Sequence, residues 1–297
     1  MPEPTTRTIM IDIDTAAREL EVLWSLPGRD CRLQPLGQSG TGLTAIIHTP
    51  AQRFFLKWMR DGGPLEAEQD GLIRLAPVVR VPGWRYLGPL AGGQALILEW
   101  LELGQSLSRG QWRELGELLR RLHSVPGEQF GYHRDNWIGA SRQYNAQSAD
   151  WATFFVNQRL APQWRWACQR GLPAAEAGQL EAVMALAMDW LSEVTVAPSL
   201  VHGDLWSGNL GTLTDGTVVL FDPAVYYGHG EVDLAMLELF GPVPEECHRG
   251  YGIDPHDPAV VQRKTLYNLY HLLNHFVLFG GGYLDAITRS CRTLLSY

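Results

Sequence analysis

The chain has 297 residues, enough for one large domain or two lobes, and its 45% hydrophobic and 19% charged residues are typical of a globular protein. The formal net charge of -8 and the lack of a long lysine or arginine tract argue against a nucleic-acid partner. No apolar run approaches the roughly 18–20 residues that cross a bilayer, and residues 1–7 do not resemble a secretory signal. We therefore expect a cytoplasmic protein without a membrane partner.

The first part of the chain is expected to be rich in strands. Residues 43–49 and 53–59 carry β-branched and aromatic side chains and are separated by turn-forming residues. A helix is predicted over 64–75, where leucines recur near one face, and a buried strand is predicted over 94–100. This pattern indicates a small sheet-rich lobe over residues 1–101.

Helices dominate the remainder. Ser108 followed by Gln111 is a capping-box pattern at the start of a helix, and apolar residues then recur at helical spacing. The same periodicity predicts helices over 180–191 and 266–276. The expected fold class is α+β, with a larger and mainly helical lobe over residues 102–297, a strand acting as a hinge, and a ligand held in the cleft between the lobes.

The segment 200–224 carries the strongest chemical signal. Apolar residues lead into Asp204, Asn209 follows five positions later, and Asp222 follows a second apolar run. The interval from Asp204 to Asn209 repeats the spacing of the catalytic loop of protein kinases. Each of these residues alone is commonly found in a turn. Together they predict phosphoryl transfer from ATP, with Asp204 as the base and Asn209 and Asp222 as Mg²⁺ ligands.

Lys57 lies within an apolar predicted strand, where an unpaired ammonium group would be costly to bury. Contact with ATP phosphates and with a helix glutamate would account for it. Glu68 is the expected partner and Glu66 the alternative, since one helix cannot easily direct both side chains to the same lysine. A strand-edge lysine that points to solvent remains the other interpretation.

Two further segments are candidates for nucleotide binding. Gly40 and Gly42 belong to a glycine-rich loop before Lys57, whose backbone amides could contact phosphates, although the loop matches no established phosphate-binding pattern. Glu99 and Leu101 lie at the predicted hinge, where backbone groups could bind the edge of an adenine. This second prediction rests on position alone.

Aromatic and histidine side chains near these motifs allow two interpretations. Trp206, between Asp204 and Asn209, could line the acceptor site or pack the loop onto the helical lobe. His202 is expected to support the catalytic loop. His271 and His275 are expected to pack within a helix, and neither a His-Glu-x-x-His pattern nor a Cys-x-x-Cys pair suggests a metal site.

The segments 202–209 and 221–229, followed by 231–241 and 266–275, resemble the fructosamine kinase family. The resemblance implies a two-lobed fold like that of protein kinases and aminoglycoside phosphotransferases. It also implies ATP- and Mg²⁺-dependent phosphorylation of the sugar 3-hydroxyl of ketosamines, with a small ketosamine or a glycated amino acid or protein as the partner. Asp135 and Asn136 would help to form the acceptor side.

Two alternatives remain at this stage. One is a phosphotransferase of the same fold that acts on an aminoglycoside, choline or a related alcohol. The other is a nucleotide-binding protein without catalytic activity, although Lys57, Asp204 and Asp222 are all present. The expected oligomeric state is a monomer, with a dimer as the alternative.

Overall fold

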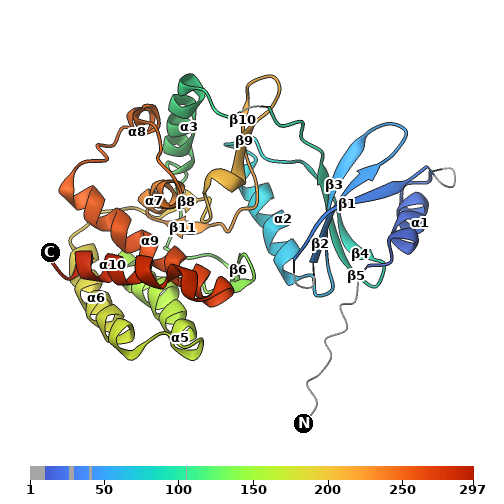
Figure 1. Ribbon diagram of the computed structural model, residues 1–297. Helices are drawn as coiled ribbons and strands as arrows, with labels where there is room; N and C mark the ends of the chain where they lie inside the picture. Colours follow the sequence, from blue (N-terminus) through green and yellow to red (C-terminus); the bar gives the residue numbers. More distant parts are fainter. Residues whose placement is uncertain (1–10, 27–29, 40–41, 105) are drawn as a thin grey trace, which may run out of the picture. The chain divides into compact units, whose positions relative to one another are not determined.

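The computed structural model describes residues 11–26, 30–39, 42–104 and 106–297 (Figure 1). The chain divides into two compact units. The first runs to Ile73 and resumes over Val81–Glu102, and the second comprises Arg74–Arg80 and Leu103–Tyr297. The first contains a five-stranded sheet and the second is mainly helical, so the fold is α+β as predicted.

The sheet of the first unit is antiparallel throughout and has the order β1-β2-β3-β5-β4. Helix α1 contributes Ala16 and Leu20 to the apolar core on the sheet. In β3, Leu56 and Trp58 are buried in this core while Lys57 between them points to the opposite face, because side chains alternate along a strand. The elements are α1 (Ile13–Leu23), β1 (Arg32–Ser39), β2 (Gly42–His48), β3 (Arg53–Met59), α2 (Gly63–Leu75), β4 (Trp84–Leu90) and β5 (Gly93–Glu99).

The second unit surrounds three short two-stranded sheets, β6-β7, β8-β11 and β9-β10, with helices. Its elements are α3 (Arg109–Leu122), β6 (Asn136–Ile138), β7 (Ser141–Gln143), α4 (Trp151–Phe155), the π-helix η1 (Val156–Leu160), α5 (Ala161–Gln169), α6 (Ala174–Ser192), β8 (Ser199–Val201), the 3₁₀ turn η2 (Ser207–Asn209), β9 (Leu210–Thr212), β10 (Val218–Leu220), β11 (Tyr226–Gly228), α7 (Glu231–Leu239), α8 (Glu245–Tyr251), α9 (Pro258–Phe279), the 3₁₀ turn η3 (Gly281–Tyr283) and α10 (Leu284–Leu294).

The helices predicted from periodicity are present. The capping box is confirmed, because Ser108 N donates to Gln111 Oε1 at 2.9 Å and Gln111 N donates to Ser108 Oγ at 3.4 Å. α6 and α9 contain the predicted helices 180–191 and 266–276, and both are longer than predicted. Among the helices of the described residues, none is long and apolar enough to cross a membrane.

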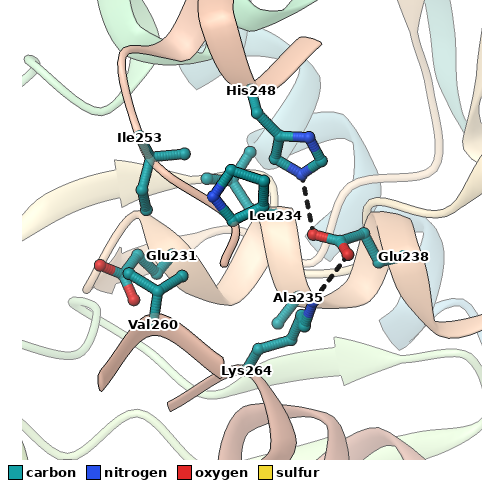
Figure 2. A pocket seen from close by; sticks show the side chains of 9 residues that line it. Glu231, Leu234, Ala235, Glu238, His248, Ile253, Val260 and Lys264 are labelled. Carbon is teal, nitrogen blue, oxygen red and sulfur yellow. Dashed lines mark hydrogen bonds and ion pairs between the residues drawn. The ribbon is translucent and has the colours of Figure 1, made fainter. Parts of the chain in front are cut away.

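Helices α7, α8 and α9 meet around a small pocket (Figure 2). Glu238 of α7 accepts hydrogen bonds from His248 Nε2 and from Lys264 Nζ, each at 2.9 Å. Burial opposes ionisation of Glu238, but these two donors hold the pKa of its carboxyl below the ordinary value. One carboxylate therefore links the three helices that follow the segment 200–224 in sequence.

Candidate active site

The segment after β8 carries Asp204, and the carboxylate of Asp233 fixes its backbone. Asp233, 1% exposed in the first turn of α7, accepts hydrogen bonds from His202 N at 2.7 Å and Gly203 N at 2.9 Å. His123 Nε2 lies 3.1 Å from the same carboxylate. Burial works against ionisation of Asp233, but the hydrogen bond and charge of His123 hold its pKa below the ordinary value. Asp233 thus remains an acceptor that holds the loop carrying Asp204.

Gly203 is required at its position for two reasons. Its φ of +82° lies in the left-handed region, and a Cβ atom there would stand 2.1 Å from the carbonyl oxygen of Ala224. The same approach allows Ala224 N to donate to His202 O at 2.8 Å. The backbone before Asp204 is therefore held directly against the backbone after Asp222.

His202 supports this arrangement from the interior, as predicted. Its ring is fully buried, its Nε2 donates to Phe221 O at 3.0 Å, and its Nδ1 accepts from Asp204 N at 3.3 Å. Burial lowers its pKa, which favours the neutral ring that this donor-and-acceptor pattern requires. His202 is therefore a supporting residue of the loop.

Asp204 has the electrostatics expected of a base. Burial raises the pKa of its carboxyl to about 7, and the negative charge of Asp222 acts in the same direction. A hydrogen bond from Asn209 Nδ2 to Asp204 Oδ2 at 3.3 Å opposes the shift. The carboxyl can therefore exchange a proton near neutral pH, where a general base is most effective.

Asn209 and Asp222 offer oxygen atoms beside this carboxyl. Asn209 is 5% exposed, and its Nδ2 also donates to Asp204 O at 2.8 Å, which leaves its Oδ1 as the acceptor atom of the amide. Phe221 N donates to Asn209 O at 3.0 Å, so Asp222 follows directly from a residue bonded to Asn209. Asp222 itself is exposed and has a φ of +56°, an uncommon conformation for a residue other than glycine.

In the first unit, Lys57 pairs with Glu68. Lys57 Nζ lies 2.9 Å from a carboxylate oxygen of Glu68, and the two side chains are only 15% and 12% exposed. Glu66, the alternative partner, is exposed on the same helix. The pair joins β3 to α2, and Lys57 is not a strand-edge residue that points to solvent.

The other residues predicted to bind nucleotide are placed as follows. Gly42 begins β2, and Gly40 lies outside the described residues. Glu99 ends β5, where its Oε2 accepts from Gly83 N at 3.0 Å and its N donates to Gly83 O at 2.7 Å. Leu101 is half-buried just beyond this strand. The Glu99 carboxylate already accepts a hydrogen bond from Gly83. The expected contact between this segment and an adenine therefore concerns backbone groups only, and it stays a prediction.

Asp135 and Asn136 differ in their surroundings. Asp135 is half-buried, and its Oδ1 accepts from Asn145 N at 2.9 Å. Asn136 is 3% exposed; its Nδ2 donates to Val225 O at 2.7 Å and its Oδ1 accepts from Gln143 Nε2 at 2.8 Å. This placement suits Asn136 for a supporting role, whereas Asp135 keeps a partly accessible carboxylate.

A buried arginine completes this support and was not predicted from the sequence. Arg159 is 0% exposed, and its Nη2 donates to Asn145 Oδ1 at 2.8 Å. Its guanidinium lies 3.9 Å from the centre of the Tyr226 ring. Gln143 Nε2 in the same network donates to Ala224 O at 3.0 Å. Buried amides and an arginine thus hold the segment that follows Asp222.

Trp206 is partly exposed, with 37% of its surface accessible. Its indole lies over Gly208, where a Cβ atom would stand 2.3 Å from the ring. The indole also meets Phe240 edge to face, with ring centroids 6.0 Å apart. The ring packs on its own loop, as one interpretation predicts, and is partly exposed. A role of Trp206 in the acceptor site stays a prediction.

Comparison with known proteins decides the family. The family model described as fructosamine kinase matches residues 34–297. The chain belongs to the fructosamine kinase family. The predicted resemblance is therefore confirmed, and it covers nearly the whole chain.

Individual relatives agree with this family. A probable ketoamine kinase of Synechocystis sp. is 44% identical over 238 residues, which cover 78% of this chain and 79% of the relative. A chloroplastic protein-ribulosamine 3-kinase of Arabidopsis thaliana is 34% identical over 266 residues, or 86% of this chain and 81% of that protein. Among solved structures, a candidate fructosamine-3-kinase from Haemophilus somnus superposes with a TM-score of 0.83 at 25% identity, covering 95% of this chain and 97% of the other.

The fold extends to more distant phosphotransferases. An aminoglycoside phosphotransferase solved as a ternary complex with ADP and hygromycin B has a TM-score of 0.66 at 14% identity, covering 93% of this chain and 98% of that one. At this identity the similarity concerns the fold alone. The protein-kinase-like fold predicted for this member of the fructosamine kinase family is therefore confirmed.

Proposed function

We propose that this protein is an ATP-dependent kinase that phosphorylates the sugar 3-hydroxyl of ketosamines, the products of sugars reacting with amines. The observation that carries the proposal is the arrangement of Asp204, Asn209 and Asp222. Asn209 Nδ2 donates to Asp204 Oδ2 at 3.3 Å, and Phe221 N, directly before Asp222, donates to Asn209 O at 3.0 Å. The names of the relatives, ketoamine kinase and protein-ribulosamine 3-kinase, support the choice of acceptor.

In the proposed reaction, Asp204 accepts the proton of the 3-hydroxyl as the hydroxyl oxygen attacks the γ-phosphorus of ATP. One bond forms between this oxygen and phosphorus, the bond from the γ-phosphorus to the bridging oxygen breaks, and ADP leaves. Because burial and Asp222 raise the pKa of Asp204, its carboxylate is a stronger base than an exposed aspartate. His202 and Asp233 hold the loop so that this carboxylate keeps its position.

The residues present fit Mg²⁺. This ion prefers oxygen ligands and usually takes only one or two from the protein. Asn209 Oδ1 and the Asp222 carboxylate supply such a set, because the Asn209 nitrogen is committed to Asp204. When bound, Mg²⁺ neutralises phosphate charge. Backbone hydrogen bonds hold the segments that carry these two residues. Phe221 N donates to Asn209 O, Ala224 N donates to His202 O, and Ala224 O accepts from Gln143 Nε2.

Lys57 is proposed to bind ATP phosphates, with Glu68 holding its ammonium group in place. Gly42 and the backbone around Leu101 are proposed to contact the phosphates and the adenine. Asp135, as a partly accessible carboxylate, is proposed to bind the acceptor.

The proposal is tested by incubating the purified protein with Mg²⁺-ATP and a panel of acceptors. The panel comprises a ribulosamine, an erythrulosamine and a fructosamine, each free and protein-bound, with an aminoglycoside and choline for comparison. We expect ADP release and a phosphate on the sugar 3-oxygen, detected by ³¹P NMR, only with the ketosamines. Turnover of the aminoglycoside or choline without turnover of any ketosamine would reject the proposed acceptor.

A further inference from the structure

The backbone of Asp222 adopts a conformation that its sequence context disfavours. Its φ of +56° lies in the left-handed region, which is unfavourable for a residue that carries a Cβ atom. Pro223 follows, and the residue before a proline ordinarily takes an extended conformation. Strained conformations of this kind persist where the surrounding structure fixes the flanking backbone, and they cluster at functional sites. We therefore expect their cause in the hydrogen bonds of the residues on either side.

Backbone hydrogen bonds fix the chain on both sides of Asp222. Phe221 N, directly before it, donates to Asn209 O at 3.0 Å, and Ala224 N, two positions after it, donates to His202 O at 2.8 Å. The direction of the chain is thus set one residue before Asp222 and again two residues after it. A change of φ at Asp222 would move one of these hydrogen-bonded groups.

Two buried amide side chains hold the backbone that follows Asp222. Gln143 Nε2 donates to Ala224 O at 3.0 Å, and Asn136 Nδ2 donates to Val225 O at 2.7 Å. Gln143 Nε2 also donates to Asn136 Oδ1 at 2.8 Å, so the two amides bind each other. Both side chains are buried, and an unmade hydrogen bond is costly in such a place. These amides therefore resist any rotation of the two carbonyl groups.

Arg159 is joined to this pair of amides through Asn145. Arg159 Nη2 donates to Asn145 Oδ1 at 2.8 Å, and Asn145 Nδ2 donates to Asn136 Oδ1 at 2.8 Å. The guanidinium also donates to two backbone carbonyl oxygens and lies 3.9 Å from the centre of the Tyr226 ring, and all of these partners are neutral. Burying a cation among neutral groups is costly, which favours a role for Arg159 beyond packing. Four polar side chains are here called the buried cluster: Arg159, Asn145, Asn136 and Gln143.

We propose that the buried cluster imposes the left-handed conformation on Asp222 and thereby sets the affinity of the site for Mg²⁺. Arg159 is a positioning residue: it holds the amides of the cluster, and these hold the carbonyl groups of Ala224 and Val225. This inference rests on the proposed function, in which Asp222 binds Mg²⁺. It adds that a fully buried side chain, which no ligand can touch, controls that affinity.

Two variants disrupt the buried cluster in different ways. Arg159→Lys keeps the charge but cannot make all the hydrogen bonds of the guanidinium. Gln143→Met keeps the length of the side chain but removes the hydrogen bond to Ala224 O, and it leaves Arg159 in place if Arg159→Lys fails to fold.

The melting temperature of the protein without nucleotide or metal tests the strain. Asp222→Gly should melt about 2 °C higher than Asp222→Ala, because glycine takes a positive φ without penalty. In a protein that also carries Arg159→Lys or Gln143→Met, the backbone can relax. There Asp222→Gly should melt no higher than Asp222→Ala, because only the greater freedom of glycine in the unfolded chain remains. Differential scanning fluorimetry measures each difference.

The metal requirement tests the positioning role. With Asp222 intact, Arg159→Lys and Gln143→Met should each raise the Mg²⁺ concentration for half-maximal ADP release, with a ribulosamine and saturating ATP, by about 10- to 100-fold. This is the usual effect of losing a group that orients a metal ligand. Ile287→Ala in α10 is the control for lost stability. Ile287 is fully buried, so this variant should melt at a lower temperature but need no more Mg²⁺ than the wild-type protein.

Three results would overturn the inference while leaving the proposed kinase activity intact. The first is a difference between Asp222→Gly and Asp222→Ala that is the same with and without the cluster variants. The second is an unchanged Mg²⁺ requirement in a folded cluster variant. The third is an equal increase of that requirement in Ile287→Ala, which would make it a consequence of lost stability. No turnover of any ketosamine by the wild-type protein would reject the proposed function, whereas the comparison of melting temperatures, which needs neither metal nor activity, would still test the strain on Asp222.

Discussion

Asp204 combines two requirements that oppose each other. A base must be ionised to accept a proton, yet burial and the neighbouring Asp222 both disfavour the ionised carboxyl and raise its pKa from 3.8 to about 7. A raised folded-state pKa contributes stability that is fully present below pH 3.8 and is lost as pH rises through about 7. The ionised carboxylate that the proposed reaction needs therefore destabilises the folded protein.

Replacing Asp204 with asparagine should separate its proposed role as a base from its effect on the stability of the fold. We expect Asp204→Asn to lower kcat by about 10²- to 10⁴-fold, the usual contribution of a general base. Without nucleotide or metal, it should melt at a higher temperature than the wild-type protein at pH 8, and the gap should shrink toward pH 4. Differential scanning fluorimetry across this range measures the gap.

Asp215→Asn is the matched control. Asp215 is an exposed turn residue whose pKa is lowered by hydrogen bonds from Thr217, so this variant should show no gain in melting temperature at pH 8. A gap for Asp204→Asn that is equal at pH 4 and pH 8 would contradict the raised pKa.

The sequence predicts the proposed site residues that local spacing singles out. Asp204 and Asn209 are five positions apart, and Lys57 is a cation within an apolar strand. Asp233 was missed as a site residue because its hydrogen-bond partner His202 lies 31 positions away and its partner His123 lies 110 positions away. The only local feature that marks Asp233 in the sequence is that it is an acidic residue among apolar ones.

At the scale of elements, the close approach of α3 and α8 supports the loop that carries Asp204. A Cβ atom on Gly116 of α3 would lie 2.0 Å from Cys247 O, and one on Gly250 of α8 would lie 2.1 Å from Arg113 O. Glycine at both positions allows the backbones to meet. The approach brings Tyr251 OH to 2.9 Å from Nδ1 of His123, the residue that binds Asp233.

Gly116→Ala should therefore destabilise the protein by about 1–3 kcal/mol, the usual cost of overpacking, because the added methyl group meets backbone that cannot move aside. Gly110→Ala in the first turn of the same helix is the control. The nearest atom there is Ser108 Oγ at 3.9 Å, so we expect no loss and a gain of up to about 1 kcal/mol. Urea denaturation followed by tryptophan fluorescence measures both, and equal midpoints for the two variants would contradict this interpretation of the helix contact.

Helices with regularly spaced apolar residues could be predicted from the sequence. α3 and α9 repeat apolar residues at helical spacing over several turns, so the sequence indicated both. The π-helix η1 carries no such signal, because its hydrogen bonds span one residue more than those of an α-helix and so change which side chains face inward. Arg159 on η1 is therefore fully buried where a charged residue would be expected at the surface.

At the scale of the whole molecule, the residues proposed for phosphoryl transfer are divided between the two units. Lys57 and Glu68 belong to the first unit, and Asp204, Asn209 and Asp222 to the second. Phosphoryl transfer needs positioned phosphates, neutralised charge and an oriented nucleophile, and neither set supplies all three. Under the proposed function, nucleotide binding should therefore stabilise the protein through residues of each unit.

Thermal stability in the presence of Mg²⁺-ATP tests this dependence. A ligand at 100 times its Kd stabilises the folded state by about 2.7 kcal/mol, so saturating Mg²⁺-ATP should raise Tm of the wild-type protein by several degrees. Lys57→Met should lose most of this increase. Asp222→Ala should lose the Mg²⁺-dependent part of the increase in Tm, which EDTA abolishes in the wild-type protein. The control variant Asp215→Asn should keep the full increase. A full increase in Lys57→Met would reject the proposed role of Lys57, and a full increase in Asp222→Ala would reject that of Asp222, whereas losses in both variants would show that each residue contributes to binding Mg²⁺-ATP.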